Sequence, residues 1–242
     1  MNLLNDARVL TSLLRGIPRK GEHASRLNDF YRHQAGDYDR FRERLLSGRR
    51  ELMKRLPLQS GDLVVELGGG TGRNVDFLGT RANLLQRYEV VDLCQPLLDI
   101  AKQRAARNPC VQAIEGDATT YRPGRPADVV VFSYALSMIP MWRDAINNAV
   151  AMLKQGGTLA VVDFYVSAAR PPAGMARHGR FTRWFWPRWF GHDGVRLSSE
   201  SLETVSACTD RFHLVEDLAK VPYVPSVRVP FYTYMGRKLQ KV

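Results

Sequence analysis

Cysteine is scarce in this sequence. It occurs three times, as Cys94, Cys110 and Cys208, and no two of these residues form a CxxC pair. An odd, scattered set gives neither a disulfide framework nor the ligand spacing of a zinc site. We therefore expect reduced thiols in a cytoplasmic compartment and no bound metal.

Long apolar runs are also missing. No run approaches the roughly 20 residues that a membrane-spanning helix requires, so we expect no segment to cross a bilayer. The N-terminal stretch MNLLNDARVLTSLLRGIPRK is interrupted by Asn5, Asp6 and Arg8, which argues against a signal peptide. Its leucines recur near helical spacing and predict a helix that either packs on the domain or lies on a membrane surface.

Acidic residues are outnumbered. Lys and Arg total 35 against 24 Asp and Glu, which gives a net charge of +11 and predicts an anionic partner. Arginine concentrates at 29–55 and again in HGRFTRWFWPRWFGHDGVR, residues 178–196, which also holds Trp184, Trp186 and Trp189. Basic residues among aromatic rings suit either single-stranded nucleic acid or lipid headgroups, and composition alone favours neither.

Strand-like and helix-like patterns alternate along most of the sequence. From residue 60 onward, short aliphatic runs alternate with segments of helical pattern. Strands are expected at 62–67, 88–93, 110–114, 128–132, 158–164, 212–218 and 229–237. Helices are expected at 73–85, 96–107, 142–154 and 199–209. This order predicts an α/β fold with a seven-stranded, mostly parallel, doubly wound sheet.

Two regions fall outside that alternation. We interpret residues 1–59 as an N-terminal helical lid and residues 60–242 as one domain, with an aromatic and basic insert at 168–198. A chain of 242 residues is long enough for a single core with such additions.

A glycine-rich stretch, VVELGGGTGRNVDFLG, opens the candidate site. Glu66, Gly68, Gly70 and Gly72 form E-x-G-x-G-x-G at the end of the first expected strand. Glycines there permit a tight turn and let a ligand lie against bare backbone. The same glycines would also serve a purely structural turn, so the motif alone is weak evidence.

Two aspartates strengthen the case for a nucleoside ligand. Asp92 ends the second expected strand about 20 residues after the turn, where an acid can accept from both hydroxyls of a ribose. Asp117 follows the third strand, where a carboxylate can accept from an exocyclic amine such as that of adenine. A dinucleotide enzyme would usually show G-x-G-x-x-G, which disfavours NAD here.

These motifs resemble the class I S-adenosylmethionine-dependent methyltransferases. The resemblance implies that Gly68, Gly70 and Gly72 lie under the methionyl part of S-adenosyl-L-methionine, with Asp92 on the ribose and Asp117 on the adenine. The full set expected around this cofactor is Tyr38, Glu66, Gly68, Gly70, Gly72, Asn74, Asp92, Leu93, Asp117, Ala118 and Ser133.

At a finer level the chain resembles the bacterial diacylglyceryl-homoserine N-methyltransferases, which make betaine lipids. The segments that carry this likeness are FYRHQAGDYDRFRERLLSGR, VELGGGTGRN, FSYALSMIPMW, VDFYVS, WFGHDGVRLS and VPYVPSVRVPFYTYMGRK. The glycine segment is common to many methyltransferases, whereas SMIPMW, WFGHDGV and the C-terminal proline-aromatic segment are more specific. The chain departs from the fused betaine-lipid synthases at Arg73, where they carry tryptophan.

This likeness implies an amine-bearing lipid substrate and a reaction at the inner face of the membrane. Arginines would attract the anionic surface and pair the substrate carboxylate, and the three tryptophans of the insert would sit at headgroup level. The insert could instead be an aromatic lid over the active site. A separate aminocarboxypropyl transferase would supply the acceptor lipid, and no nucleic acid is expected.

The implied reaction is an in-line attack of a neutral amine on a sulfonium methyl group, which needs a path for the amine proton. Tyr134 and Asp163 follow strands at the sheet edge where open α/β folds bind ligands. The candidate catalytic residues are Tyr31, Tyr134, Asp163 and His192. An aromatic wall would hold the quaternary ammonium product, although each of its members could equally be plain packing: Tyr31, Tyr134, Trp142 or Tyr165.

Other classes remain open at this stage. A phosphatidylethanolamine N-methyltransferase would share the fold, the cofactor and the membrane surface. An RNA methyltransferase would also be basic, but the chain shows no NPPY-like tetrapeptide after the fourth strand. A non-catalytic binding protein is disfavoured because the cofactor glycines and acids are all present.

Overall fold

The computed structural model describes residues 25, 28–29, 43, 45–191, 194–221 and 227–239. Most of the expected lid therefore lies outside the described residues, as do Tyr31, Tyr38 and His192. Several described residues of that segment contact the main domain, among them Asn28, Glu43 and Ser47. The Asn28 side chain accepts a hydrogen bond from the Gln95 backbone amide at 2.9 Å, and the Ser47 carbonyl accepts one from the Tyr134 hydroxyl at 2.7 Å.

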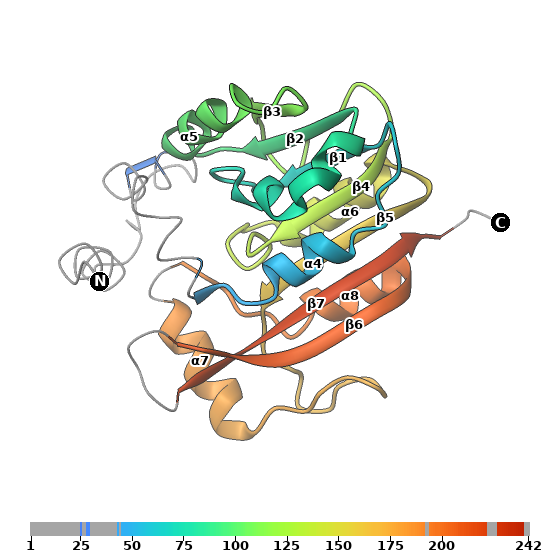
Figure 1. Ribbon diagram of the computed structural model, residues 1–242. Helices are drawn as coiled ribbons and strands as arrows, with labels where there is room; N and C mark the ends of the chain where they lie inside the picture. The colour runs from blue at the N-terminus through green and yellow to red at the C-terminus, as the bar shows by residue number, and fades with distance from the viewer. Residues whose placement is uncertain are drawn as a thin grey trace.

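The core of the molecule is one seven-stranded sheet in the order β3-β2-β1-β4-β5-β7-β6 (Figure 1). The strands are β1 Leu63–Leu67, β2 Arg87–Asp92, β3 Val111–Glu115, β4 Ala127–Ser133, β5 Leu153–Phe164, β6 Thr209–Lys220 and β7 Arg228–Lys238. β7 runs antiparallel to both β5 and β6, and the pairs from β3 to β5 are parallel. The predicted seven-stranded, mostly parallel α/β fold is confirmed.

Burial on both faces explains why the central strands read as unbroken aliphatic runs. Every residue of β1 and of β4 is buried, as expected of parallel strands that helices cover on each side. One face packs against helical residues such as Leu52, Phe77 and Trp186. The other face packs against Ile146 and Val205. The sheet is therefore the middle layer of three.

The helices are α4 Arg49–Arg55, the 3₁₀ segment η1 Arg73–Leu84, α5 Gln95–Ala105, α6 Trp142–Met152, α7 Arg180–Gly191 and α8 Ser201–Cys208. α4, η1 and α7 contribute to one core cluster, and α6 and α8 to the other. The helix expected at 142–154 ends two residues early because the chain passes directly into β5 at Leu153. η1 is interrupted at Gly79, which has a left-handed backbone.

One helix was not predicted. α7 lies inside the segment that the sequence marked only as an insert, and it contains Pro187. An interior proline removes one helical hydrogen bond and costs about 3 kcal/mol or more. Burial of Trp186 and Phe190 on the same helix offsets that cost. Burial of Trp186 also corrects the expectation that all three tryptophans of the insert face outward.

No described helix is both long enough and apolar enough to cross a membrane. Within the same described ranges, no cluster of three or more His, Cys, Asp or Glu side chains is arranged to hold a metal ion.

Candidate active site

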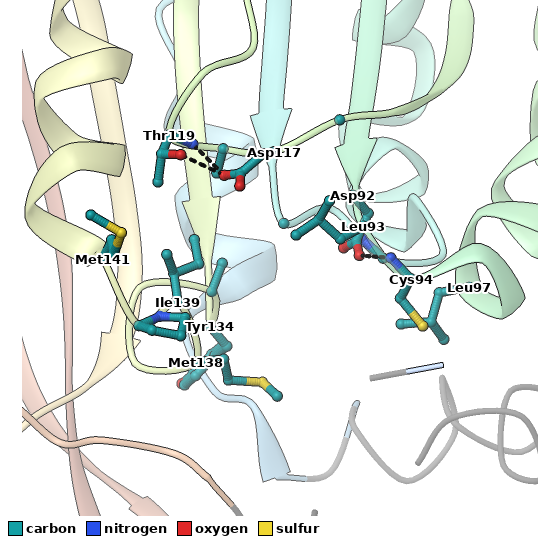
Figure 2. A pocket seen from close by; sticks show the side chains of 16 residues that line it. Asp92, Leu93, Cys94, Leu97, Asp117, Thr119, Tyr134, Met138, Ile139 and Met141 are labelled. Carbon is teal, nitrogen blue, oxygen red and sulfur yellow. Dashed lines mark hydrogen bonds between the residues drawn. The ribbon is translucent and has the colours of Figure 1, made fainter. Parts of the chain in front are cut away.

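A cavity of about 310 Å³ opens where β1, β2, β3 and β4 end (Figure 2). The chain reverses its direction of winding between β1 and β4, and ligands of open α/β sheets bind at such a switch point. The cavity is lined by Gly68, Gly70, Asp92, Leu93, Cys94, Leu97, Gly116, Asp117, Ala118, Thr119, Tyr134, Ala135, Met138, Ile139, Pro140 and Met141.

The turn after β1 forms the floor of the cavity and requires glycine. Gly68, Gly70 and Gly72 have φ values of 68°, 56° and 67°, which side chains rarely tolerate. A Cβ added at Gly68 would lie 2.6 Å from the Cβ of Ala135. The turn therefore presents bare backbone toward the cavity, as a ligand lying against the main chain needs.

Asp92 holds this turn from the neighbouring strand. Its Oδ2 accepts a hydrogen bond from the Gly70 amide at 2.8 Å, and its Oδ1 accepts one from the Cys94 amide at 2.8 Å. Each carboxylate oxygen has two acceptor sites. The half-buried carboxylate can therefore fix the turn and also accept from the vicinal hydroxyls of a ribose.

Asp117 approaches the cavity from the end of β3 (Figure 2). The Thr119 amide and hydroxyl both donate to its Oδ1, each at 2.8 Å. These two bonds fix the orientation of the carboxyl group. Its Oδ2 can accept a hydrogen bond from the exocyclic amine of a base seated between β3 and β4.

Glu66 lies behind the turn rather than in the cavity. The Tyr88 hydroxyl donates to it at 2.8 Å and the Asn74 side-chain amide donates at 2.5 Å. Burial raises the pKa of the Glu66 carboxyl to about 7, and the two hydrogen bonds oppose that rise. Glu66 and Asn74 thus form a buried polar support beneath the glycine turn.

Of the predicted catalytic residues that the structure describes, Tyr134 borders the cavity and Asp163 does not. The Tyr134 φ of 55° is unusual for a residue other than glycine, and such strain occurs often at functional sites. Its amide donates to the Val162 carbonyl at 2.7 Å, its hydroxyl donates to the Ser47 carbonyl at 2.7 Å, and its ring centroid lies 4.5 Å from that of Phe164.

Asp163 is buried at the end of β5 and does not border the cavity. The Ser137 amide donates to its Oδ2 at 2.9 Å, and the Ser137 hydroxyl donates to its Oδ1 at 2.7 Å. Burial raises the pKa of Asp163 to about 6, against the hydrogen bonds that lower it. The geometry makes Asp163 an anchor for the loop between β4 and α6, and a catalytic role stays a prediction.

The predicted residues that the structure describes divide into two groups. Those that reach the cavity are Gly68, Gly70, Asp92, Leu93, Asp117, Ala118 and Tyr134. Those that lie outside its lining are Glu66, Gly72, Asn74, Ser133 and Asp163. Tyr165, suggested for an aromatic wall, is buried against Tyr232 and His178, with its hydroxyl donating to Glu216.

Sequence reasoning missed the apolar wall of the cavity. Met138, Ile139, Pro140 and Met141 form one side of it, and Leu97 contributes from α5 (Figure 2). Apolar loop residues carry no chemical signal of their own. The available hint was that these residues fall in SMIPMW, one of the more specific segments of the family resemblance.

Comparison with known proteins agrees with this geometry. Residues 64–157 match the model of a methyltransferase domain family. A trans-aconitate 2-methyltransferase of Rhizobium rhizogenes is 26% identical over 132 residues, which are 52% of this chain and 48% of that protein. A ubiquinone/menaquinone biosynthesis C-methyltransferase of Hydrogenovibrio crunogenus is 24% identical, over 59% of this chain and 60% of that protein. The matched region thus spans about half to three fifths of these curated relatives.

Solved structures share the fold over most of the chain. N-methyltransferase NodS from Bradyrhizobium japonicum, in complex with S-adenosyl-L-homocysteine, has a TM-score of 0.63 at 18% identity, covering 88% of this chain and 99% of that one. A Haemonchus contortus phosphoethanolamine N-methyltransferase in complex with S-adenosylhomocysteine has a TM-score of 0.68 at 14% identity, covering 92% of this chain and 61% of that one. At these identities the likeness establishes the architecture.

Proposed function

We propose that the chain is a class I S-adenosylmethionine-dependent methyltransferase that methylates the amine of a lipid headgroup; the match of residues 64–157 to a methyltransferase domain and the shared fold support the first part. The acceptor that we propose is diacylglyceryl-homoserine, converted to the trimethylated betaine lipid at the inner face of the membrane. Phosphatidylethanolamine is the alternative acceptor.

One observation carries the proposal: the glycine turn, Asp92 and Asp117 all border the same cavity. Gly68 and Gly70 line the cavity without side chains, so a ligand can lie directly against the backbone of the turn. The two carboxylates are placed for a ribose and a base. The residues present therefore fit an adenosyl group, with Asp92 and Asp117 as the acceptors that would bind its ribose and its base.

The far wall of the cavity supports an acceptor that brings apolar mass with it. Met138, Ile139 and Pro140 give this side an apolar surface, and Met141 at its rim is 61% exposed. An exposed large apolar side chain at a cavity mouth is unfavourable in water and suits contact with a hydrophobic ligand. A lipid headgroup with its acyl chains attached fits this apolar wall better than a small soluble acid does.

The cofactor supplies an electrophilic methyl group that a neutral amine can attack in line, so that an N–C bond forms as the C–S bond breaks. The chain's share of the work is binding and alignment. Asp92 and the turn fix one partner, and Tyr134, locked by Ser47 and Val162, shapes the place where the amine enters. The proton lost by each ammonium leaves to water or to a nearby base.

Nitrogen as the methyl acceptor is supported by the segment resemblances and by N-methyltransferases among the similar folds. The curated relatives include enzymes named for methylation of an acid and of a quinone precursor. Acceptor chemistry therefore has to be tested directly.

The test is incubation of the purified protein with radiolabelled S-adenosylmethionine and defined lipids in mixed micelles. Parallel reactions contain diacylglyceryl-homoserine, phosphatidylethanolamine, trans-aconitate or total RNA, and products are separated by chromatography. We expect label in the homoserine lipid and, with time, in its trimethylated form. Label in phosphatidylethanolamine alone would favour the alternative acceptor. Label only in a water-soluble product or in RNA would refute the lipid assignment.

A further inference from the structure

Helix α7 exposes a cluster of large aromatic side chains. Phe181, Trp184 and Trp189 are 69%, 53% and 51% exposed, and Phe185 lies between them, partly buried. We call these four residues the α7 aromatic face. Trp186 and Phe190 point the other way and are buried in the core. The helix is therefore firmly seated on the domain while its other side offers aromatic surface to solvent.

The α7 aromatic face is organised by ring contacts. Phe181 stacks on Phe185 with centroids 5.4 Å apart and an interplanar angle of 14°. Phe185 contacts Trp189 at 5.4 Å, and the Arg188 guanidinium lies 4.9 Å from the centre of the Trp184 ring. The rings thus cover one another's faces and form a continuous apolar surface.

Positive charge accompanies this surface. Arg180 and Arg188 are exposed on the same helix, which carries no acidic residue. Arg170 and Arg177 are exposed in the segment that leads into it. Aromatic residues beside arginines match the interface of an anionic bilayer, where Trp sits at headgroup level and the cations meet lipid phosphates.

Single-stranded nucleic acid fits this surface less well. Bases bind by stacking on open ring faces. Here one face of Trp184 is covered by Arg188, and Phe181 and Phe185 are stacked on each other. Contact with a bilayer buries exposed apolar surface and does not require open ring faces. The exposed surface of Phe181, Trp184 and Trp189 remains available for it.

The α7 aromatic face is linked to the cavity by a chain of ring contacts. Phe190, on the inner side of α7, lies 5.1 Å from Phe164, and Phe164 lies 4.5 Å from Tyr134, which lines the cavity. The Arg196 amide, just beyond α7, donates to the Ser137 carbonyl in the β4–α6 loop at 2.6 Å. Figure 1 shows α7 beside the end of the sheet where β7 begins. Because β7 is antiparallel to β5, this is also the end where β5 finishes.

We propose that the α7 aromatic face docks the protein on an anionic lipid bilayer, with the mouth of the methyltransferase cavity turned toward the headgroups. The inference rests on the proposed function for what enters the cavity. The docking surface itself stands on the exposure, packing and charge of α7.

The test is sedimentation of the protein with vesicles of phosphatidylcholine containing phosphatidylglycerol, compared with vesicles of phosphatidylcholine alone. The variant is Trp184→Ala combined with Trp189→Ala. Because the variant removes two large side chains that the bilayer would bury, we expect vesicle affinity to fall at least about tenfold. Added salt should weaken binding of the wild-type protein to the anionic vesicles.

The matched control is Phe212→Ala. Phe212 lies on β6, is 48% exposed and contacts Arg237. The substitution therefore removes an aromatic ring that is about as exposed as Trp184 and Trp189 but lies outside α7. We expect its vesicle affinity to match that of the wild-type protein. A second variant, Arg180→Glu with Arg188→Glu, reverses charges on exposed residues and should reduce binding to the anionic vesicles alone.

Unchanged vesicle binding by the tryptophan variant, with unchanged circular dichroism and thermal midpoint, would overturn the proposal. Binding of the wild-type protein to single-stranded RNA but to no vesicle, lost in the same variant, would overturn it in favour of nucleic acid.

Measurement of methyl transfer separates this inference from the proposed function. We expect the tryptophan variant to retain transfer to detergent-dispersed lipid and lose it on vesicles. Failure of the wild-type protein to methylate any lipid, with vesicle binding still dependent on α7, would refute the function and leave the docking surface.

Discussion

Gly68 and Gly79 both have a positive φ but differ in what surrounds them. Their φ values are 68° and 56°. A Cβ at Gly68 would lie 2.6 Å from Ala135, whereas a Cβ at Gly79 would meet nothing within 4 Å. The pair therefore separates the cost of a positive φ from the added cost of the collision with Ala135.

We expect Gly79→Ala to lower the free energy of unfolding by about 1 to 3 kcal/mol, the cost of holding alanine in a sparsely populated backbone conformation with positive φ. Gly68→Ala should cost more, because the turn must also move away from Ala135. Only Gly68→Ala should weaken binding of S-adenosylhomocysteine, measured by isothermal titration calorimetry. Equal effects of the two substitutions on binding would contradict the assignment of this turn as the cofactor floor.

Glu66 gives a prediction about pH. Burial raises its pKa from 4.5 to about 7, so the folded protein holds this proton more tightly than the unfolded chain does. The stabilisation is therefore fully present below about pH 4.5 and is lost as pH rises toward about 7. A shift of this size corresponds to about 3 kcal/mol at most.

Glu66→Gln removes this proton and keeps an oxygen that can accept from Asn74 or Tyr88. We expect the free energy of unfolding of the wild-type protein, relative to the variant, to fall by up to about 3 kcal/mol between roughly pH 5 and pH 8. Urea unfolding at the two pH values measures it. Parallel pH profiles for the two proteins would show that the Glu66 carboxyl is not perturbed.

At the residue scale the sequence identified the groups whose chemistry is distinctive. Asp92 and Asp117 were found from their positions after expected strands, and both border the cavity. Met138 and Ile139 were missed because an apolar residue in a loop looks the same whether it faces a ligand or the core. The residue type and position of Asp163 predicted a catalytic role, whereas its hydrogen bonds to Ser137 depend on the tertiary fold and could not be predicted from the sequence.

At the scale of elements, the loop between β4 and α6 connects the sheet to the cavity. It is held by Asp163 from β5 and, through the Ser137 carbonyl, by Arg196 beyond α7. Asp163 could either fix this loop or accept the substrate proton, and the two roles predict different effects on kcat. Substitution of Ser137 removes the hydrogen bond from its hydroxyl to Asp163 but keeps the carboxylate, so it separates the two roles.

If Asp163 anchors the loop, Ser137→Ala and Asp163→Asn should each lower kcat only several-fold, since one hydrogen bond contributes about 1 kcal/mol. The shape of the pH profile of kcat should be unchanged. If Asp163 is the base, Asp163→Asn should lower kcat by about 10² to 10⁴ and remove the acidic limb of the profile, and Ser137→Ala should not. Rates of methyl transfer from radiolabelled cofactor between about pH 5 and 9 decide between them.

Strands were predicted more reliably than the helix of the insert, for a physical reason. The aliphatic run of β4 is buried on both faces, so its pattern follows directly from its environment. α7 violates the local rules with Pro187, and its aromatic residues are distributed on both sides. Its helical structure depends on Trp186 and Phe190 packing against the sheet, which is tertiary information that no local pattern contains.

At the scale of the whole molecule, the order of elements was enough to predict the sheet, because alternating strands and helices leave few topologies open. The sheet order then brings the ends of β1 to β4 to one edge, which explains how residues from 68 to 141 come to share one cavity. Residues outside the described ranges, including Tyr31, Tyr38 and His192, stay predictions.

The whole molecule should also respond to its cofactor as a unit. A ligand that binds only the folded state at about 100 times its Kd stabilises that state by about 2.7 kcal/mol. In a domain of this size each kcal/mol raises the midpoint of thermal unfolding by about 2 to 4 °C. We therefore expect S-adenosylhomocysteine to raise the midpoint by about 5 to 11 °C in differential scanning calorimetry, and NAD to leave it unchanged.

Asp92→Ala should abolish the shift, because it removes the acceptor of the Gly70 amide and of the ribose. Asp99→Ala, which removes an exposed acid from the neighbouring helix, should retain it. A shift with NAD, or a full shift in Asp92→Ala, would mean that the nucleoside is held elsewhere.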